Sequence, residues 1–289
     1  MAETEIEFNP NVDQNVIVLD EHDTIDQCAS AYGDRLAEWY EAHKLIVLPY
    51  WKLNTDISFL QTLTLPDRMH KIGSANGIDG PMFELKGSSL VSRNPLYHLK
   101  LDLPIKVLIR DQIFAIFQQL RSDLRKLFPR YRMEEANITF RFSPVTAAPD
   151  SGRHVDVFGQ SWPKHRLKLF LNMDTTPRIW RTSFDILRLL EVYREELRDI
   201  SPNIDRNDFN VIVNERLGRV VPSHTIRYPT LSCIIGNGET VLHEVVSGNR
   251  MIAMEFAVDI DSMLNPDSYI GAVLPTHIRK FSMAGEVAS

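Results

Sequence analysis

The chain has 289 residues, of which 44% are hydrophobic and 24% are charged, and its formal net charge is −6 at pH 7. This composition is typical of a globular protein long enough to bury a large core, and we expect a single domain over residues 1–289. The negative charge argues against a nucleic-acid partner, because binding to phosphates needs a basic face.

The first residues, the apolar runs and the cysteines indicate where in the cell the protein is found. The first ten residues, MAETEIEFNP, are acidic and lack the basic and apolar regions of a secretory signal. The longest apolar runs, such as residues 45–51, are too short to span a bilayer. Cys28 and Cys233 lack the spacing of a disulfide framework or a zinc site, so we expect two buried thiols. We therefore expect a cytoplasmic protein without a membrane-spanning segment.

The first part of the chain, residues 1–135, is predicted to be a helical and loop-rich support. Apolar residues at steps of three and four predict a helix over residues 23–42, followed by a strand at 45–51. Residues 54–100 are rich in Gly, Ser, Asn and Pro, which predicts loops with short strands. A second helical pattern runs from residue 104 to about 128 and is ended by a proline.

The second part, residues 136–262, has the pattern of short strands. NITFRFS, RLKLFLNMD and PRIWR precede an insertion at about 183–215, and HTIRYPTLSCIIG, TVLHEVV and RMIAMEFAVDI follow it. Within the insertion, residues 183–199 have a helical pattern that begins with a serine able to cap a helix. The order predicts a mainly β fold, a double-stranded β-helix (jelly-roll, cupin-like) core flanked by helices.

A His-x-Asp pair in GRHVDVFGQ follows a predicted buried strand. Alone, His154 and Asp156 are explained equally well by bonds to the backbone at a strand end, because such a pair arises easily by chance. However, His243 lies on a second apolar strand, which a jelly roll can bring beside the first. Two imidazoles and one carboxylate are the donor set of non-haem Fe(II) oxygenases, and they leave positions open for a bidentate 2-oxo acid and O2.

A 2-oxo acid with a second carboxylate needs a buried cation to hold it. Lys168 is the first candidate because it interrupts an apolar strand, on a face shared with Arg166 and Phe170. The alternative for Lys168 is a position on the solvent face. The predicted cosubstrate-binding set is Lys168, Arg178, Arg250 and Asn172, and the predicted substrate-binding set is Arg141, Trp180, Arg166 and Phe158. For Trp180 a core position, and for Arg141 a solvent-facing one, are the plain alternatives.

The segments FRFSP, HVDVF, KLFLN, PRIWR and LHEVVSG occur in an order that resembles the Kdo hydroxylase family of Fe(II)/2-oxoglutarate-dependent dioxygenases. The resemblance spans most of the chain and is distant in the first 100 residues. It implies that His154, Asp156 and His243 are iron ligands and that Lys168, Arg178 and Trp180 lie near the cosubstrate or substrate. The chain departs from the family at Lys168, where arginine is usual, at a shorter loop between residues 172 and 177, and at Arg250, where an apolar or aromatic residue is usual.

The resemblance implies Fe(II), 2-oxoglutarate and O2 as cofactors and hydroxylation of an unactivated C–H bond as the reaction. Asp156 disfavours halogenation, because halide takes that iron position in related halogenases, whereas desaturation and ring closure stay open. Arginines around the predicted mouth indicate a small polar substrate with a carboxylate, such as an amino-acid-like biosynthetic intermediate.

The sequence leaves the substrate, the reaction class and the oligomeric state undecided. One alternative is a Kdo 3-hydroxylase acting on the inner core of lipopolysaccharide. Another is a metal-binding jelly roll without oxygen chemistry, such as an isomerase or a ligand-binding module. A homodimer is one option for the oligomeric state.

Overall fold

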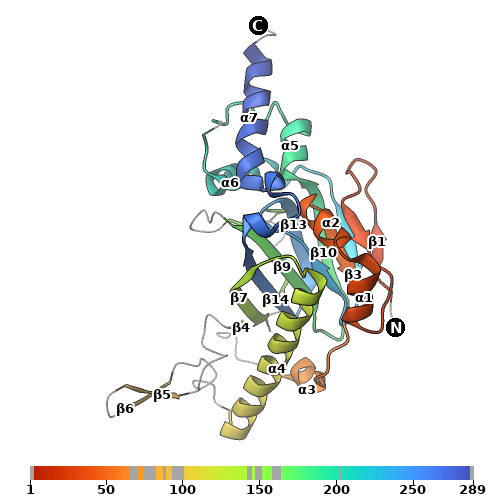
Figure 1. Cartoon of the computed structure of the whole chain (residues 1–289), viewed down its shortest axis with the longest axis vertical. Helices are drawn as coiled ribbons and strands as arrows, with labels where there is room; N and C mark the ends of the chain where they lie inside the picture. Colours follow the sequence, from red (N-terminus) through yellow and green to blue (C-terminus); the bar gives the residue numbers. More distant parts are fainter. Residues whose placement is uncertain are drawn as a thin grey trace.

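Two β-sheets face each other, with helices on one sheet and at one end, in a computed structural model of the chain (Figure 1). The structure describes residues 3–64, 71–73, 83–86, 89–92, 101–141, 145–146, 152–157, 164–201 and 203–286. The predicted jelly-roll core with flanking helices is confirmed.

Within the described residues, one sheet has five strands and the other has seven. The five-stranded sheet has the order β1 (Glu5–Glu7), β11 (His224–Tyr228), β10 (Arg178–Asp185), β13 (Val241–Gly248), β8 (Val145–Thr146). The seven-stranded sheet has the order β2 (Val16–Val18), β3 (Leu45–Leu48), β12 (Cys233–Ile235), β9 (His165–Asn172), β14 (Met251–Val258), β7 (Met133–Arg141), β4 (Lys71–Gly73). All described pairings in these sheets are antiparallel except that of β2 with β3. A separate hairpin joins β5 (Phe83–Lys86) to β6 (Ser89–Ser92).

The first helical segment, predicted over residues 23–42, is two helices. Thr24 begins α1 (Ile25–Tyr32) with a capping box shared with Gln27. Gly33 ends it at φ 52°, a left-handed conformation that favours glycine, and α2 (Arg35–Glu41) follows. A short helix that the sequence pattern did not predict, α3 (Ser58–Thr62), lies among the described parts of residues 54–100.

The long helix predicted over residues 104–128 is confirmed as α4 (Leu103–Leu127). Its buried face carries Ile109, Ile113, Ile116, Phe117, Leu120 and Leu124, which belong to the largest core cluster with residues of β9, β14 and β7. This cluster also contains Leu167, Leu169 and Leu171 of β9. As expected from strand alternation, the side chains of Lys168 and Phe170 lie on the other face of β9, where they line a cavity between the sheets.

The prediction of a helix over residues 183–199 is wrong about where the helix begins and how long it is. β10 continues through Asp185, and the Ser183 hydroxyl donates to the carbonyl of Pro222 instead of capping a helix. The cap is Asp185, whose carboxylate accepts from the backbone N–H groups of Leu187 and Arg188 at the start of α5 (Ile186–Val192). Turns follow α5, and a second helix of the insertion is α6 (Arg206–Leu217).

The insertion helices and the C-terminal helix form a second core at one end of the sheets (Figure 1). Phe209, Val213 and Leu217 of α6 are buried in one cluster with Ile270 and Leu274 of α7 (Ile270–Glu286). Both cysteines are free and buried, as predicted. In the part of the chain that the structure describes, no helix combines the length and apolarity needed to cross a membrane.

We predict that His165 makes the fold sensitive to mild acid. Its ring packs edge-on against Tyr40, at 5.3 Å between ring centres, and neither ring nitrogen has a hydrogen-bond partner among the described residues. Burial lowers the pKa of His165 to about 3, against about 6.5 for an unfolded chain. Between these values the unfolded state binds more protons, so stability falls as pH drops below about 6.5.

Replacing His165 with Phe removes this titration and keeps an aromatic ring beside Tyr40. We expect the loss of unfolding free energy between pH 6.5 and 4.5 to become shallower, by at most about 1.4 kcal/mol per pH unit. Urea unfolding of both proteins at pH 7, 6, 5 and 4.5 measures the difference. Parallel stability curves for the two proteins would show that His165 contributes nothing to acid sensitivity.

Candidate metal centre

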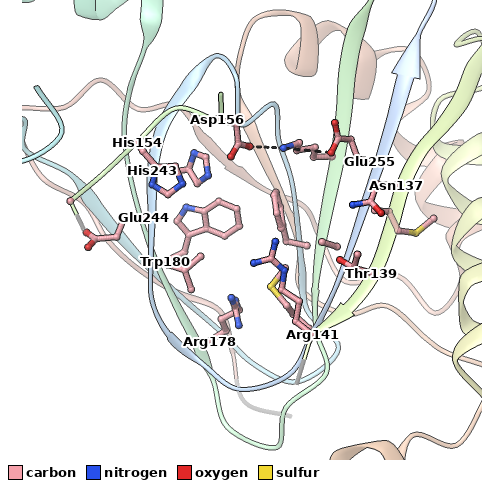
Figure 2. A pocket seen from close by; sticks show the side chains of 17 residues that line it. Asn137, Thr139, Arg141, His154, Asp156, Arg178, Trp180, His243, Glu244 and Glu255 are labelled. Atoms are coloured by element: carbon pink, nitrogen blue, oxygen red, sulfur yellow. Dashed lines mark hydrogen bonds and ion pairs between the residues drawn. The ribbon is translucent and has the colours of Figure 1, made fainter. Parts of the chain in front are cut away.

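The structure brings the three predicted metal ligands together. His154 and Asp156 lie in the segment 152–157, and His243 lies on β13. The backbone N–H of His154 donates to the carbonyl of His243 at 2.7 Å, and the reverse bond is 2.8 Å. One possible ligand atom from each of the three side chains lies within 4.8 Å of the others. Figure 2 shows the two imidazoles and the carboxylate at one end of a pocket.

The protonation of His243 suits a metal ligand. Its Nδ1 lies 2.9 Å from the carbonyl oxygen of Val241, which can only accept, so Nδ1 carries the proton. The Nε2 lone pair is then available, and a hydrogen bond on the other ring nitrogen is typical of metal-binding histidines. Burial also lowers the pKa of His243 to about 4, which keeps the ring neutral at neutral pH.

Asp156 is held in its charged form. Burial alone would raise its pKa, but the ammonium of Lys168, aided by His243 and His154, lowers the pKa to about 2. Lys168 Nζ lies 2.5 Å from Asp156 Oδ2 and 3.8 Å from Glu255 Oε2. Two imidazoles and an ionised carboxylate at these separations fit a divalent iron ion. Asp156 Oδ2 is paired with the Lys168 ammonium, which leaves Oδ1 of the same carboxylate for the metal.

Gly238 makes room for the Asp156 carboxylate. The backbone N–H of Asp156 donates to the Gly238 carbonyl at 2.6 Å, which brings the turn before β13 against the carboxylate. A Cβ at position 238 would overlap Asp156 Oδ2 and would lie 3.1 Å from Cε1 of the His243 ring. Position 238 therefore requires glycine because its backbone lies close against the Asp156 carboxylate, and not because of an unusual backbone conformation.

The pocket beside the three ligands has a volume of about 390 Å³. Its walls come from β7, β9, β10, β13 and β14, so both sheets contribute. Trp180 lies between the histidines and Arg178 in Figure 2, and its ring centre is 5.2 Å from that of His243 and 4.6 Å from that of Phe170. The predicted pocket residues that line this cavity are Arg141, Lys168, Arg178 and Trp180.

Arg178 is the most buried of these cations, at 1% exposed. Its Nε has no hydrogen-bond partner among the described residues, and its guanidinium lies beside the buried Tyr228 hydroxyl, where it opposes the rise of the Tyr228 pKa that burial causes. Gly248 of β13, at φ 141°, leaves space for it, since a Cβ there would lie 2.5 Å from Arg178 Nη1. Arg141 lines the same pocket from β7 and is the more exposed of the two arginines. Two guanidinium groups thus face the pocket without a carboxylate partner in the described residues.

Three other predicted residues do not line the pocket. Arg166 pairs with Glu255 and faces Glu239 at 3.6 Å. Arg250 donates to the carbonyl of Leu63 at 2.8 Å and lies 3.7 Å from Asp174. The Asn172 amide donates to the carbonyls of Tyr228 and Thr176 and accepts from the N–H of Asp174, so it fixes the turn after β9. Phe158 lies outside the described residues.

The pocket also contains residues that were not predicted from the sequence. Asn137 and Thr139 line it from β7, on the same face as Arg141, and Glu255 lines it from β14. Asn137 Oδ1 is buried without a hydrogen-bond partner among the described residues. The alternation in NITFR was the available signal, because an inward-facing arginine implies that the asparagine and threonine at steps of two face inward as well.

Comparisons with known proteins support the fold. No protein-family model and no curated protein sequence matches the chain. Among solved structures, the complex of the Kdo hydroxylase KdoO, a non-heme Fe(II) alphaketoglutarate dependent dioxygenase, with succinate and Fe(III) has a TM-score of 0.68 and 15% identity, covering 94% of this chain and 96% of that one. The KdoO complex with alphaketoglutarate and Fe(III) has a TM-score of 0.66 and 16% identity over the same shares. The chain therefore has the fold of KdoO over almost its whole length.

We predict that Gly238→Ala weakens metal binding without unfolding the protein. The added methyl group displaces the Asp156 carboxylate, which sits at the end of a side chain that can rotate away. We expect the dissociation constant for Co(II), measured by titration, to rise by about 10-fold or more, while the melting temperature of the metal-free protein changes little. Unchanged Co(II) affinity would mean that Asp156 tolerates the methyl group or is not a ligand.

Proposed function

We propose that this protein is an Fe(II)- and 2-oxoglutarate-dependent dioxygenase that hydroxylates a small, carboxylate-bearing metabolite. The observation that carries the proposal is the convergence of His154, Asp156 and His243 beside a pocket lined by two arginines without carboxylate partners among the described residues. Three ligands on one side of a metal leave positions for a 2-oxo acid and O2. The fold likeness to KdoO supports the same assignment.

The protein's part in the reaction is to bind, orient and exclude water. Iron held by the three side chains, together with 2-oxoglutarate and O2, supplies the oxidation of an unreactive C–H bond. Lys168 keeps Asp156 ionised for metal binding. Trp180 and Phe170 form an apolar wall beside His243, which limits water near the metal.

Arg178 is our candidate for the anchor of the distal carboxylate of 2-oxoglutarate, in place of Lys168. The Lys168 ammonium is already paired with Asp156 and lies near Glu255, so an added carboxylate would have to displace these partners. Arg178 is buried, faces the pocket across Trp180 from the histidines, and has an unpartnered Nε. A buried guanidinium without a carboxylate partner is strongly stabilised by a bidentate anion.

The remaining pocket groups indicate the substrate class. Arg141, the more exposed of the two arginines, is available to a substrate carboxylate, while the unpartnered Asn137 Oδ1 and the Thr139 hydroxyl are available to ammonium or hydroxyl donors. A cavity of about 390 Å³ fits the cosubstrate together with part of a small metabolite. An amino-acid-like compound has a carboxylate for Arg141 and an ammonium group for Asn137 and Thr139, so it is our first candidate for the substrate class.

A Kdo-type sugar acid is the second candidate, favoured by the fold likeness to the Kdo hydroxylase KdoO over 94% of this chain. It also carries a carboxylate for Arg141 and hydroxyls for Asn137 and Thr139. A screen that measures succinate formation above the substrate-free background, with free amino acids in one set and Kdo-containing lipopolysaccharide fragments in the other, separates the two classes.

The metal and cosubstrate assignment has a direct spectroscopic test. Anaerobic protein with Fe(II) and 2-oxoglutarate should develop a weak visible charge-transfer band, and air should then yield succinate. We expect His243→Ala and His154→Ala to lose both signals, whereas His277→Ala, a change on α7, should retain them. A protein that binds Fe(II) but gives neither signal would instead be a metal-binding jelly roll without oxygen chemistry.

The cosubstrate anchor is tested by Arg178→Met and Lys168→Met. We expect Arg178→Met to weaken 2-oxoglutarate binding about 10- to 100-fold, the loss typical of a charge-assisted hydrogen-bond pair, with Fe(II) affinity kept. Lys168→Met should mainly weaken Fe(II) binding, because it removes the partner of Asp156. Titrating the charge-transfer band with 2-oxoglutarate at saturating Fe(II), and then with Fe(II) at saturating 2-oxoglutarate, gives the two comparisons. The opposite pattern would return the anchor to Lys168.

A further inference from the structure

Helix α6 borders the segment that carries two of the proposed metal ligands. The backbone of His154 pairs with β13, but this is a single bridge and not a continuous ladder. Val155, the next residue, presents its N–H and carbonyl to the opposite side, as alternate residues of an extended chain do. Its side chain is fully buried in the core formed by the insertion helices and α7.

The side chain of Asn214 takes the place of a neighbouring strand at this edge. Its Oδ1 accepts from the backbone N–H of Val155 at 2.7 Å, and its Nδ2 donates to the Val155 carbonyl at 2.9 Å. One residue of an antiparallel strand makes the same pair of bonds with the residue opposite it. The amide of Asn214 therefore satisfies an extended backbone that the described sheet leaves unpaired on this side.

Asn210, one helical turn earlier, extends this contact to Asp156. Its Nδ2 donates to the carbonyl of Asp156 at 2.9 Å and to that of Glu239 at 3.3 Å. At the other end of α6, the carbonyl of Gly218 accepts from the backbone N–H of Arg153 at 2.9 Å. Asn210 and Asn214 are four residues apart and so lie on one face of the helix. α6 and its C-cap residue thus bond to the backbone of three of the four residues from Arg153 to Asp156.

α6 is itself fixed in place. Its carboxylate cap is Asp205, and Phe209, Val213 and Leu217 pack in the core with α7. Arg206 lies 3.1 Å from the buried carboxylate of Glu239, which belongs to the turn that also contains Gly238. The Gly238 carbonyl in the same turn accepts a hydrogen bond from the backbone N–H of Asp156. The segment 153–156 is therefore bonded on one side to α6 and on the other to this turn, and the Arg206–Glu239 ion pair connects α6 to the turn.

We infer that Asn214 and Asn210 are positioning residues for the metal centre. Through the backbone of residues 153–156 they fix where the side chains of His154 and Asp156 lie, although neither asparagine contacts those side chains' ligand atoms in any described bond. This inference rests on the proposed function, since it assumes that a metal ion binds the three ligands. It gives the α5–α6 insertion the role of bracing the metal site.

The test compares Asn214→Ala with Glu215→Ala in the full-length protein. Glu215 is the next residue of α6 and is exposed, so its removal controls for any general effect on the helix. For each variant we would measure the melting temperature of the metal-free protein, the dissociation constant for Co(II), and the visible absorption spectrum of the Co(II) complex. Asn210→Ala is a second, independent variant should Asn214→Ala fail to fold.

A positioning role predicts that folded Asn214→Ala and Asn210→Ala bind Co(II) about 10- to 100-fold more weakly than the wild type, with an altered spectrum, while Glu215→Ala matches the wild type. A purely structural role would lower the melting temperature and leave the affinity and spectrum of the folded protein unchanged, which would overturn the inference alone. Absence of Co(II) binding by the wild type would overturn the proposed function, and the inference with it.

Discussion

The reciprocal backbone pairing of His154 with His243 is the constraint on which the site depends. It joins a segment without regular strand structure to β13 of the five-stranded sheet, and it places both imidazoles on one side of the junction, 4.7 Å apart between ring centres. Asp156, two residues after His154, projects to the same side because side chains alternate along an extended chain. The donor set is therefore a product of backbone geometry, and the pocket side chains are arranged around it.

The charged groups buried beside the candidate metal centre are paired with one another, because an unpaired buried charge is strongly destabilising. Lys168, Glu255, Arg166 and Glu239 continue inward from Asp156 as alternating charges, ending at Arg206 on α6. Removing one member would leave a neighbour buried without its partner, which costs more than the pair contributes. This row of charges connects Asp156 to the insertion helix by a route separate from the asparagine contacts.

Local pattern predicted much of this arrangement. α4 and the inward face of β9 follow from periodicity, and the order of helical and strand patterns predicted the jelly roll. The donor types of His154, Asp156 and His243, together with the likeness in motif order, predicted that these three residues converge. Side-chain pairing over long sequence separations was not predictable. Arg250 bonds to Leu63 and Asn172 bonds to Tyr228, which lie 187 and 56 residues away, and no pattern near Arg250 or Asn172 in the sequence indicates these partners. Asn210 and Asn214 had no signal either, because asparagine in a helix ordinarily indicates an exposed position.

The two guanidinium groups that face the pocket have a practical consequence. Partial burial of the Arg141 side chain lowers its pKa, and the fully buried guanidinium of Arg178 lowers it further, because the two positive charges repel each other. A pocket with this charge attracts any small divalent anion in its surroundings. Sulfate and phosphate ions therefore compete with any carboxylate ligand for Arg141 and Arg178. The affinity measured for such a ligand will be weaker in sulfate or phosphate than in a buffer of bulky organic ions.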